Sequence, residues 1–319
     1  MRDVVILYAR AVCLVIFSML MFPLSTLADP TADSSSASEV TSAAPIDRLA
    51  QYITVRKSFT GTTKDANAPA TIVVETASPG SSDTAVDIGV KGKLPDFGTD
   101  PFTLNLSPAI EWHKSTLEEN PVDKLSIDAT LFVARFLSTF NDYIGSDLKY
   151  KIARDFVLDN NPNSIVWRIF YHTGERPGPW PGLHLKLNGE ELFYYLPSIG
   201  LEHYSKLALK EQQFGQSVQL AAPVSGSFYT LALNFFLNPF PATFNEQLTI
   251  IGTITQRIRF AGDPSIPKDS TLSQLSLTYF FDRSRNYGFG VDYQNGRDPD
   301  RNFVAQTRTS VGLKFQIGK

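Results

Sequence analysis

The sequence predicts an all-β protein, an antiparallel transmembrane β-barrel of about 12 to 14 strands. From residue 71 onward, apolar and polar residues alternate, as in strands with one apolar and one polar face. The alternating runs are about 9–14 residues long; a tilted strand needs about 9–11 residues to cross a bilayer, and strands of soluble domains have about 5–6. In the last four runs, the following charged residues fall on the polar face: Arg257, Arg259, Asp292, Arg308 and Lys314.

Residues 102–113 show the alternation most clearly, with Phe102 and Trp112 on one parity and Glu111 and His113 on the other. Further runs cover residues 228–237, 248–260, 274–282, 287–294 and 308–317, and weaker ones cover 84–94, 124–137, 148–157 and 164–173. Four residues depart from the pattern: Arg135, Arg154, Ile251 and Gln256. Residues 183–222 are harder to divide, although Asn188-Gly189 predicts a two-residue hairpin turn.

Alternation alone does not say whether the apolar face meets lipid or a protein core. A basic residue on the lipid face at mid-bilayer costs about 2–4 kcal/mol, which explains charges confined to the other face. Aromatic residues also lie near the run ends on the apolar parity, as in interfacial girdles: Trp112, Phe260, Tyr279, Phe281, Tyr287 and Tyr293. These features favour lipid, and a soluble exported β-sandwich is the alternative.

The first 70 residues differ in composition from the rest. Residues 1–28 predict a signal peptide, with Arg2 and Arg10 around the n-region and a mostly apolar stretch at 11–24. Residues 29–70 predict a Ser/Ala/Thr-rich tether and N-terminal extension, and residues 71–319 the barrel. Cys13 and every Met lie within the predicted leader, which excludes structural disulfides, thiolate metal sites and a catalytic thiol from the mature chain.

The connections suggest an orientation. A short polar turn at 282–286 lies on the same side as the C-terminus, and the longer connections 261–270 and 295–302 lie on the other. Outer-membrane barrels pair short periplasmic turns with longer external loops, so we expect a periplasmic C-terminus. The Gly- and Pro-rich segment 174–182 predicts either a surface loop whose Trp180 anchors at the interface, which we favour, or a constriction inside the lumen.

The last run, residues 310–317, resembles the C-terminal insertion signal of bacterial outer-membrane β-barrel proteins. Its signal positions are Ser310, Gly312, Phe315 and Ile317. Many bacterial members end on an aromatic residue, whereas this chain continues to Gly318-Lys319. The resemblance implies insertion by the barrel-assembly machinery into the outer membrane of a Gram-negative bacterium, with outer-membrane lipid as a partner; it identifies no particular family.

The sequence offers little for catalysis. The four histidines are His113, His172, His184 and His203, and no metal-spaced His pair, GxSxG or phosphate-binding Gly pattern occurs. Residues 293–299 resemble the active-site segment of outer-membrane phospholipase A, but Asp292 and Gln294 stand where that segment has its His and Ser. The pair Glu111 and His113 suits acid/base chemistry, although we expect both to be solvated lumen or rim residues.

We therefore expect a channel or transport protein for small polar solutes, without enzymatic activity, metal or cofactor. A net charge of −3 gives no case for nucleic acid as a partner. The alternatives are a barrel hydrolase acting on lipid or glycan, and a non-conducting surface-interaction anchor whose opposite charges pair and close the lumen. The candidate lumen-lining residues are Glu111, His113, Arg257, Arg259, Asp292, Arg308 and Lys314.

Overall fold

The structure is a computed structural model of the chain. It describes residues 53–56, 70–77, 81–92, 94, 96–98, 101–116, 122–137, 142–173, 184–187, 190–213, 216–219, 222–239 and 247–316. The predicted signal peptide, most of the tether, the 174–182 segment and Ile317 lie outside these residues. In the segments described, no helix is long and apolar enough to cross a membrane.

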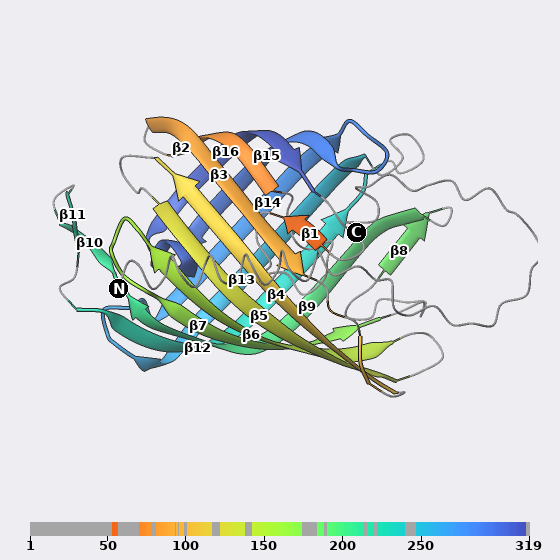
Figure 1. The fold of residues 1–319 in the computed structure, drawn as a ribbon, viewed down its shortest axis with the longest axis horizontal. Coiled ribbons are helices and arrows are strands. Elements are labelled where there is room, and N and C mark those ends of the chain that lie inside the picture. The colour runs from red at the N-terminus through yellow and green to blue at the C-terminus, as the bar shows by residue number, and fades with distance from the viewer. Residues whose placement is uncertain are drawn as a thin grey trace, which may run out of the picture. The chain divides into compact units, whose positions relative to one another are not determined.

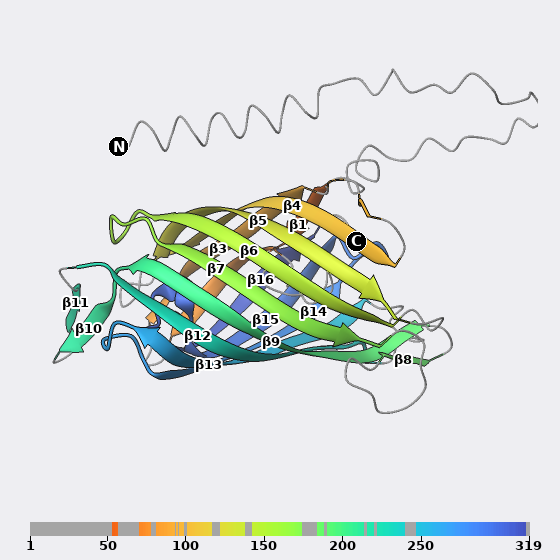
Figure 2. The same ribbon diagram turned by 90° about the horizontal axis from the view of Figure 1, so that it is seen from below.

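Twelve strands of the described chain close into an antiparallel barrel, which confirms the predicted fold class. Each strand pairs with its neighbour along the chain, and the last pairs with the first to close the sheet (Figures 1 and 2). The barrel strands are β2 (Ala70–Ala77), β3 (Ser81–Gly92), β4 (Phe102–Ser115), β5 (Val122–Phe136), β6 (Tyr143–Asp155), β7 (Asn163–His172), β9 (Glu190–Leu207), β12 (Val224–Leu237), β13 (Leu248–Gly262), β14 (Asp269–Phe280), β15 (Tyr287–Arg297) and β16 (Ala305–Phe315).

Four shorter strands accompany the barrel. β1 (Ile53–Arg56) pairs with β3. β8 (His184–Leu187) pairs with the start of β9, the hairpin that Asn188-Gly189 predicts. β10 (Lys210–Gln213) and β11 (Gln216–Gln219) form a separate hairpin that projects past one end of the barrel (Figure 1).

The two faces of the sheet follow the predicted alternation. In β4, Leu106 and Trp112 are exposed on the outer face, while Ser107 and Glu111 are buried on the inner face. Ile251 and Gln256, which depart from the apolar–polar pattern, do not interrupt the alternation of faces in β13. Ile251 points inward and lines an interior cavity, and Gln256 points outward. A closed sheet has no free edges, and the outer face is mainly apolar because most polar residues of the strands point inward.

The exceptional arginines lie near strand ends. Arg135 is the second-last residue of β5, is exposed, and stacks over Phe102 at 5.6 Å from the ring centroid. Arg154 is the second-last residue of β6 and pairs with Asp159 in the following turn. A charge placed there reaches the interface, where an outward arginine costs little.

The barrel has two ends, here called rims. The C-terminal rim holds the end of β16 and the turn 281–286, where the Gln316 amide donates to the Asn286 carbonyl at 2.8 Å. The far rim holds the connections 263–268 and 298–304. Exposed aromatic residues lie near both rims on the outer face: Tyr279, Phe281 and Tyr287 at the C-terminal rim, and Trp112, Tyr229 and Phe260 towards the far rim. These positions agree with the predicted girdles, whereas Tyr293, which is also exposed, lies nearer the middle of β15.

An outward position tests whether the apolar surface faces lipid. Ile254 lies at the middle of β13 and Ile258 four residues nearer the far rim, with side chains 44% and 43% exposed. In phospholipid bilayers, we expect Ile254→Arg to lower the free energy of unfolding by about 2–4 kcal/mol and Ile258→Arg by about 0–1 kcal/mol. Equal losses for the two variants, measured by denaturant titration in vesicles, would argue against a membrane at this depth.

Candidate functional site

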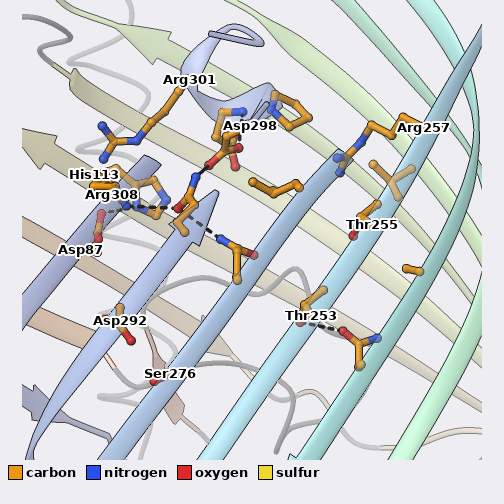
Figure 3. A pocket seen from close by; sticks show the side chains of 18 of the residues that line it. Asp87, His113, Thr253, Thr255, Arg257, Ser276, Asp292, Asp298, Arg301 and Arg308 are labelled. Atoms are coloured by element: carbon orange, nitrogen blue, oxygen red, sulfur yellow. Dashed lines mark hydrogen bonds and ion pairs between the residues drawn. The ribbon is translucent and has the colours of Figure 1, made fainter. Parts of the chain in front are cut away.

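The inner face of the barrel is polar and encloses a cavity of about 180 Å³. Basic residues line it from several strands and from the connection 298–304, with Arg257 on one side and Arg301, Arg308 and His113 on another (Figure 3). Six Lys or Arg residues against four Asp residues border the cavity: Lys149, Lys151, Arg168, Arg257, Arg301 and Arg308 against Asp87, Asp292, Asp298 and Asp300. The lining is therefore polar and net basic.

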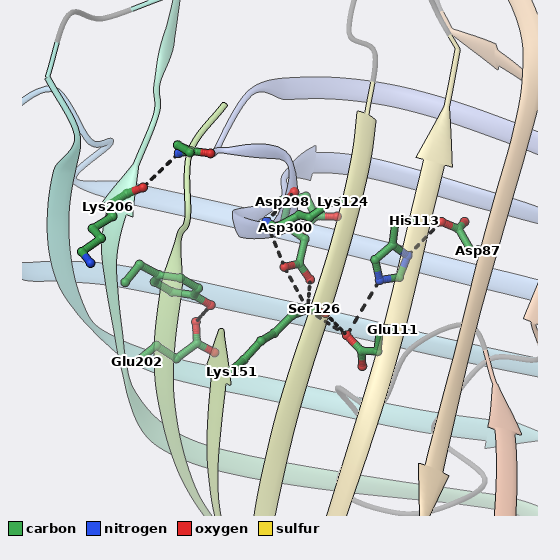
Figure 4. Close-up of polar contacts among 12 residues, drawn as sticks. Asp87, Glu111, His113, Lys124, Ser126, Lys151, Glu202, Lys206, Asp298 and Asp300 are labelled. Carbon is green, nitrogen blue, oxygen red and sulfur yellow. Dashed lines mark hydrogen bonds and ion pairs between the residues drawn. The ribbon is translucent and has the colours of Figure 1, made fainter. Parts of the chain in front are cut away.

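One ion network centres on Glu111 of β4, whose side chain is fully buried. Lys151 donates to Glu111 Oε2 at 2.7 Å (Figure 4), and Lys149 lies 3.3 Å from Oε1. Lys149 also pairs with Asp128 of β5 at 3.1 Å. The carboxylate thus ties β4 to β6, two strands away around the barrel, through groups that alternation points inward.

His113 extends this network to β3. Its Nδ1 lies 2.9 Å from Asp87 Oδ1, and its Nε2 lies 3.8 Å from Glu111 Oε2. The expectation of a solvated residue is wrong for Glu111, whose side chain is 0% exposed, whereas His113 is 12% exposed and borders the cavity. The lysines on β6 explain the difference, because buried carboxylates are stable only when they are paired.

A second network centres on Glu202 of β9, which is also buried. Arg257 Nε donates to Glu202 Oε2 at 2.6 Å, and the Tyr204 hydroxyl donates to the same oxygen at 2.7 Å. Arg168 of β7 lies 3.7 Å from the other carboxylate oxygen. Arg257, predicted as a lumen residue, is therefore both a cavity wall and the main counter-ion of Glu202.

A third network lies on β14 to β16. Lys314 pairs with Asp292 and donates to Ser276 Oγ at 2.8 Å. A Cβ at Gly290 would lie 2.7 Å from Lys314 Cε, so glycine at this inward position makes room for the lysine stem. Arg308 donates to Gln294 at 3.2 Å, which in turn donates to Asp298 at 3.0 Å.

Arg259 has a different role from the other predicted residues. Its Nη1 donates to the Gly262 and Asp263 carbonyls at 3.0 and 2.7 Å, where β13 passes into the far-rim connection. It is absent from the cavity lining, as are Glu111 and Lys314, whereas His113, Arg257, Asp292 and Arg308 border the cavity. The inward parity predicted from sequence therefore contains cavity-lining groups, the buried Glu111 and Lys314, and Arg259 at the rim.

The connection 298–304 turns into the barrel. It contains the 3₁₀-helix η1 (Pro299–Arg301), capped by Asp298, whose carboxylate accepts from the Asp300 amide at 2.9 Å. Asp300 contacts Lys151 at 3.2 Å and Lys124 of β5 at 3.5 Å, both on the wall opposite β15 and β16 (Figure 4). The segment lies at the rim opposite the C-terminus, as predicted, and the structure adds that it folds into the barrel interior.

Phe303 fixes the other end of this segment. It is 2% exposed, stacks on Phe228 at 5.2 Å and meets Tyr204 edge-on at 5.6 Å. Ile266 from the neighbouring far-rim connection joins the same apolar cluster, and Gly226 admits it, since a Cβ there would lie 2.8 Å from Ile266 Cδ1. An ionic contact with β5 and β6 and an apolar contact with β9 and β12 therefore hold the inward segment against the barrel wall.

The charge on Asp300 follows from its neighbours. Burial alone would raise the pKa of this carboxyl, but the charges of Lys151 and Lys124 outweigh burial and hold the pKa well below its usual range. The carboxylate is therefore ionised at neutral pH. The segment thus carries a fixed negative charge into a net basic cavity.

Sequence reasoning missed part of the site. Glu202, Arg168 and Lys124 lie inward in the structure but in runs where the alternation was weak or undivided. Asp300 lies in a connection, where Asp298-Pro299 signals the start of a helical turn without indicating its direction. A parity count extended to every run would have found the strand residues but not Asp300.

His172 and His203 do not border this cavity. His172 stacks on Tyr143 at 4.6 Å near the C-terminal rim. His203 is exposed on the outer face of β9, where its Nδ1 lies 2.9 Å from Ser227 Oγ of β12. His184 lies in β8. Among the described residues, no group of His, Cys, Asp and Glu has a metal-binding arrangement.

Comparisons with known proteins leave the family open. No family model matches the chain, and no curated protein matches it. Similar solved structures include the NanC porin (10% identity, 77% of this chain and 99% of that chain, TM-score 0.40) and the KdgM porin (12%, 78%, 98% and 0.35). Another is the Pseudomonas putida toluene transporter TodX (9%, 85%, 91% and 0.35). These values assign no family, so function has to follow from this chain's own residues.

The architecture does define a class. A closed antiparallel barrel with an apolar outer surface and a polar interior is the architecture of bacterial outer-membrane β-barrel proteins, and this chain has it. Its interior holds paired charges, a polar cavity and an inward segment. Such an arrangement suits electrostatic selection of small solutes.

Removing one centre of charge tests the first network. We expect Glu111→Gln to lower the free energy of unfolding by about 3–5 kcal/mol, because Lys149 and Lys151 lose their shared buried carboxylate. Asp123→Asn is the control: its pair with Lys114 is 3.4 Å long and exposed, and its loss costs about 0–1 kcal/mol. Urea unfolding in detergent micelles measures both, and similar small losses would show that the buried network contributes little.

Proposed function

We propose that this protein is an outer-membrane channel for small polar solutes, with a preference for anions. The cavity supports this proposal most directly: it is polar, lies inside a closed barrel, and has six basic residues against four acidic ones in its lining. Charged groups at close quarters in a narrow pore select ions by sign.

The dimensions favour small solutes. Barrels of eight strands are filled by their own side chains, and those of 16 to 18 leave an open aqueous channel. This barrel has 12 strands, and the inward segment together with the three ion networks occupies much of its interior. A solute would have to pass beside Asp300 and the arginines.

The proposal includes location and partners. We place the C-terminal rim in the periplasm, with outer-membrane lipid around the apolar face and export by the predicted signal peptide. The barrel-assembly machinery would read the signal Ser310, Gly312, Phe315 and Ile317. The exposed side chains of Val311 and Leu313 support a lipid-facing last strand.

Planar-bilayer recording tests the channel. We expect small conductance steps in potassium chloride and a reversal potential showing chloride more permeable than potassium. The double variant Arg301→Gln/Arg308→Gln should move the permeability ratio towards unity, because two positive charges leave the cavity wall.

Arg283→Gln in the turn 281–286 is the matched control, since it removes a charge outside the cavity, and it should leave the ratio unchanged. A folded barrel that never conducts would overturn the proposal. It would favour the non-conducting surface-interaction anchor.

A second candidate function is hydrolysis of lipid esters at the outer wall. It rests on Ser227 Oγ lying 2.9 Å from His203 Nδ1, both on the lipid-facing parity near the far rim. A hydroxyl beside an imidazole base is the minimal arrangement of a nucleophile and its activator. The pair lies in adjacent strands at directly opposed positions, an arrangement that a purely structural hydrogen bond also satisfies.

A fluorophosphonate probe separates these two roles. If Ser227 is an activated nucleophile, the probe labels the wild-type protein, and Ser227→Ala or His203→Gln abolishes labelling. Ser225→Ala is the control, because Ser225 shares the strand and face of Ser227. Absence of labelling in the folded wild-type protein would remove the hydrolase candidate.

A further inference from the structure

Lys124 and Lys151 form a cationic pair, and the carboxylate of Asp300 from the same chain binds to both. Lys151 Nζ lies 3.2 and 3.3 Å from the two oxygens of Asp300, and Lys124 Nζ lies 3.5 Å from the first of them. Lys124 also donates to the Asp300 carbonyl at 3.1 Å. Both oxygens of one carboxylate are thus bound by cations on two adjacent strands.

The two lysines are buried and belong to the rigid wall. Their side chains are 4% and 8% exposed, whereas the side chain of Asp300 is 33% exposed and borders the cavity. Lys151 keeps Glu111 as a second partner. Within the described part of the chain, Lys124 makes its polar side-chain contacts with Asp300 alone.

Asp300 comes from an irregular connection and not from a strand. Its segment is held by a single helical turn, by the Asp298 cap and by Phe303 in the apolar cluster. Movement of this segment requires no break in the barrel sheet. The carboxylate is therefore the replaceable member of the contact and the lysines are the permanent ones.

We propose that Lys124 and Lys151 are a carboxylate-binding site of the barrel, that Asp300 occupies it as an internal ligand, and that a small carboxylate solute in the cavity competes with Asp300 for it. The proposal deepens the proposed function by naming the class of anion. Its test by binding does not require conduction. A barrel that does not conduct can still pass this test, and a conducting barrel can fail it.

Chemical rescue is the direct experiment. Asp300→Ala removes a group of the size of formate and leaves the lysines in place. We expect the variant to unfold roughly 5–10 °C below the wild type, because a buried lysine loses its counter-ion. Sodium formate should restore at least half of this shift, and sodium chloride at the same ionic strength or neutral formamide should not.

Three comparisons make the result specific. The double variant Asp300→Ala/Lys124→Met should lose the response to formate. Asp269→Ala, at an exposed position of the far rim, should show neither the loss nor the rescue. Asp300→Asn keeps the shape of the side chain without its charge. If the alanine variant fails to fold, the asparagine variant takes its place, and sodium formate, but not sodium chloride, should again raise its unfolding midpoint temperature.

Heat-modifiable gel mobility in detergent gives the folded fraction against temperature for every variant. Rescue of Asp300→Ala by formate and not by chloride supports the site. Equal effects of formate and chloride would show general screening and overturn the proposal. An unchanged midpoint in both Asp300 variants would overturn it as well, because the internal carboxylate would then not be needed by the lysines.

Discussion

Pairing of charge inside a closed sheet is the constraint on which the rest of this structure depends. Because the side-chain period of a strand is two, closing the sheet sends every second residue of each strand into the interior. Charges confined there must find partners, since an unpaired buried charge costs several kcal/mol. In this structure, buried carboxylates form ion pairs with basic residues on other strands: Glu111 pairs with Lys151 of β6, and Glu202 pairs with Arg257 of β13.

The same constraint explains the inward connection. The interior of a 12-stranded barrel is too wide for all inward side chains of opposite strands to reach one another. Lys124 lies where no described wall carboxylate reaches it, and Asp300, 176 residues further along the chain, supplies the charge. Phe303 of the same segment packs in the apolar cluster. One short segment therefore supplies both a counter-ion for the lysines and a buried apolar side chain.

The fold was predictable from sequence and the site only in part, for a physical reason. Alternation is a local pattern, so the faces of residues such as Leu106 and Glu111 can be predicted without knowing which strands pair with theirs. Which inward charge meets which depends on closure and register: the contact of Lys149 with Glu111 spans 38 positions and is not written in any short pattern. The direction of the connection 298–304 depends on Lys124, Lys151 and the apolar cluster together, and its own residues signal only a turn.

The charged interior also bears on the choice between a channel and an inert anchor. Buried ion pairs often contribute less stability than well-packed apolar groups of similar volume. For a barrel that serves only as an anchor, apolar groups in place of Glu111, Glu202 and their basic partners would satisfy the same packing without the cost of burying charge. A barrel whose interior must admit water and charged solutes cannot replace its inward charges by apolar groups. The paired charges, together with a cavity whose lining is net basic, therefore support the proposed passage of polar solutes.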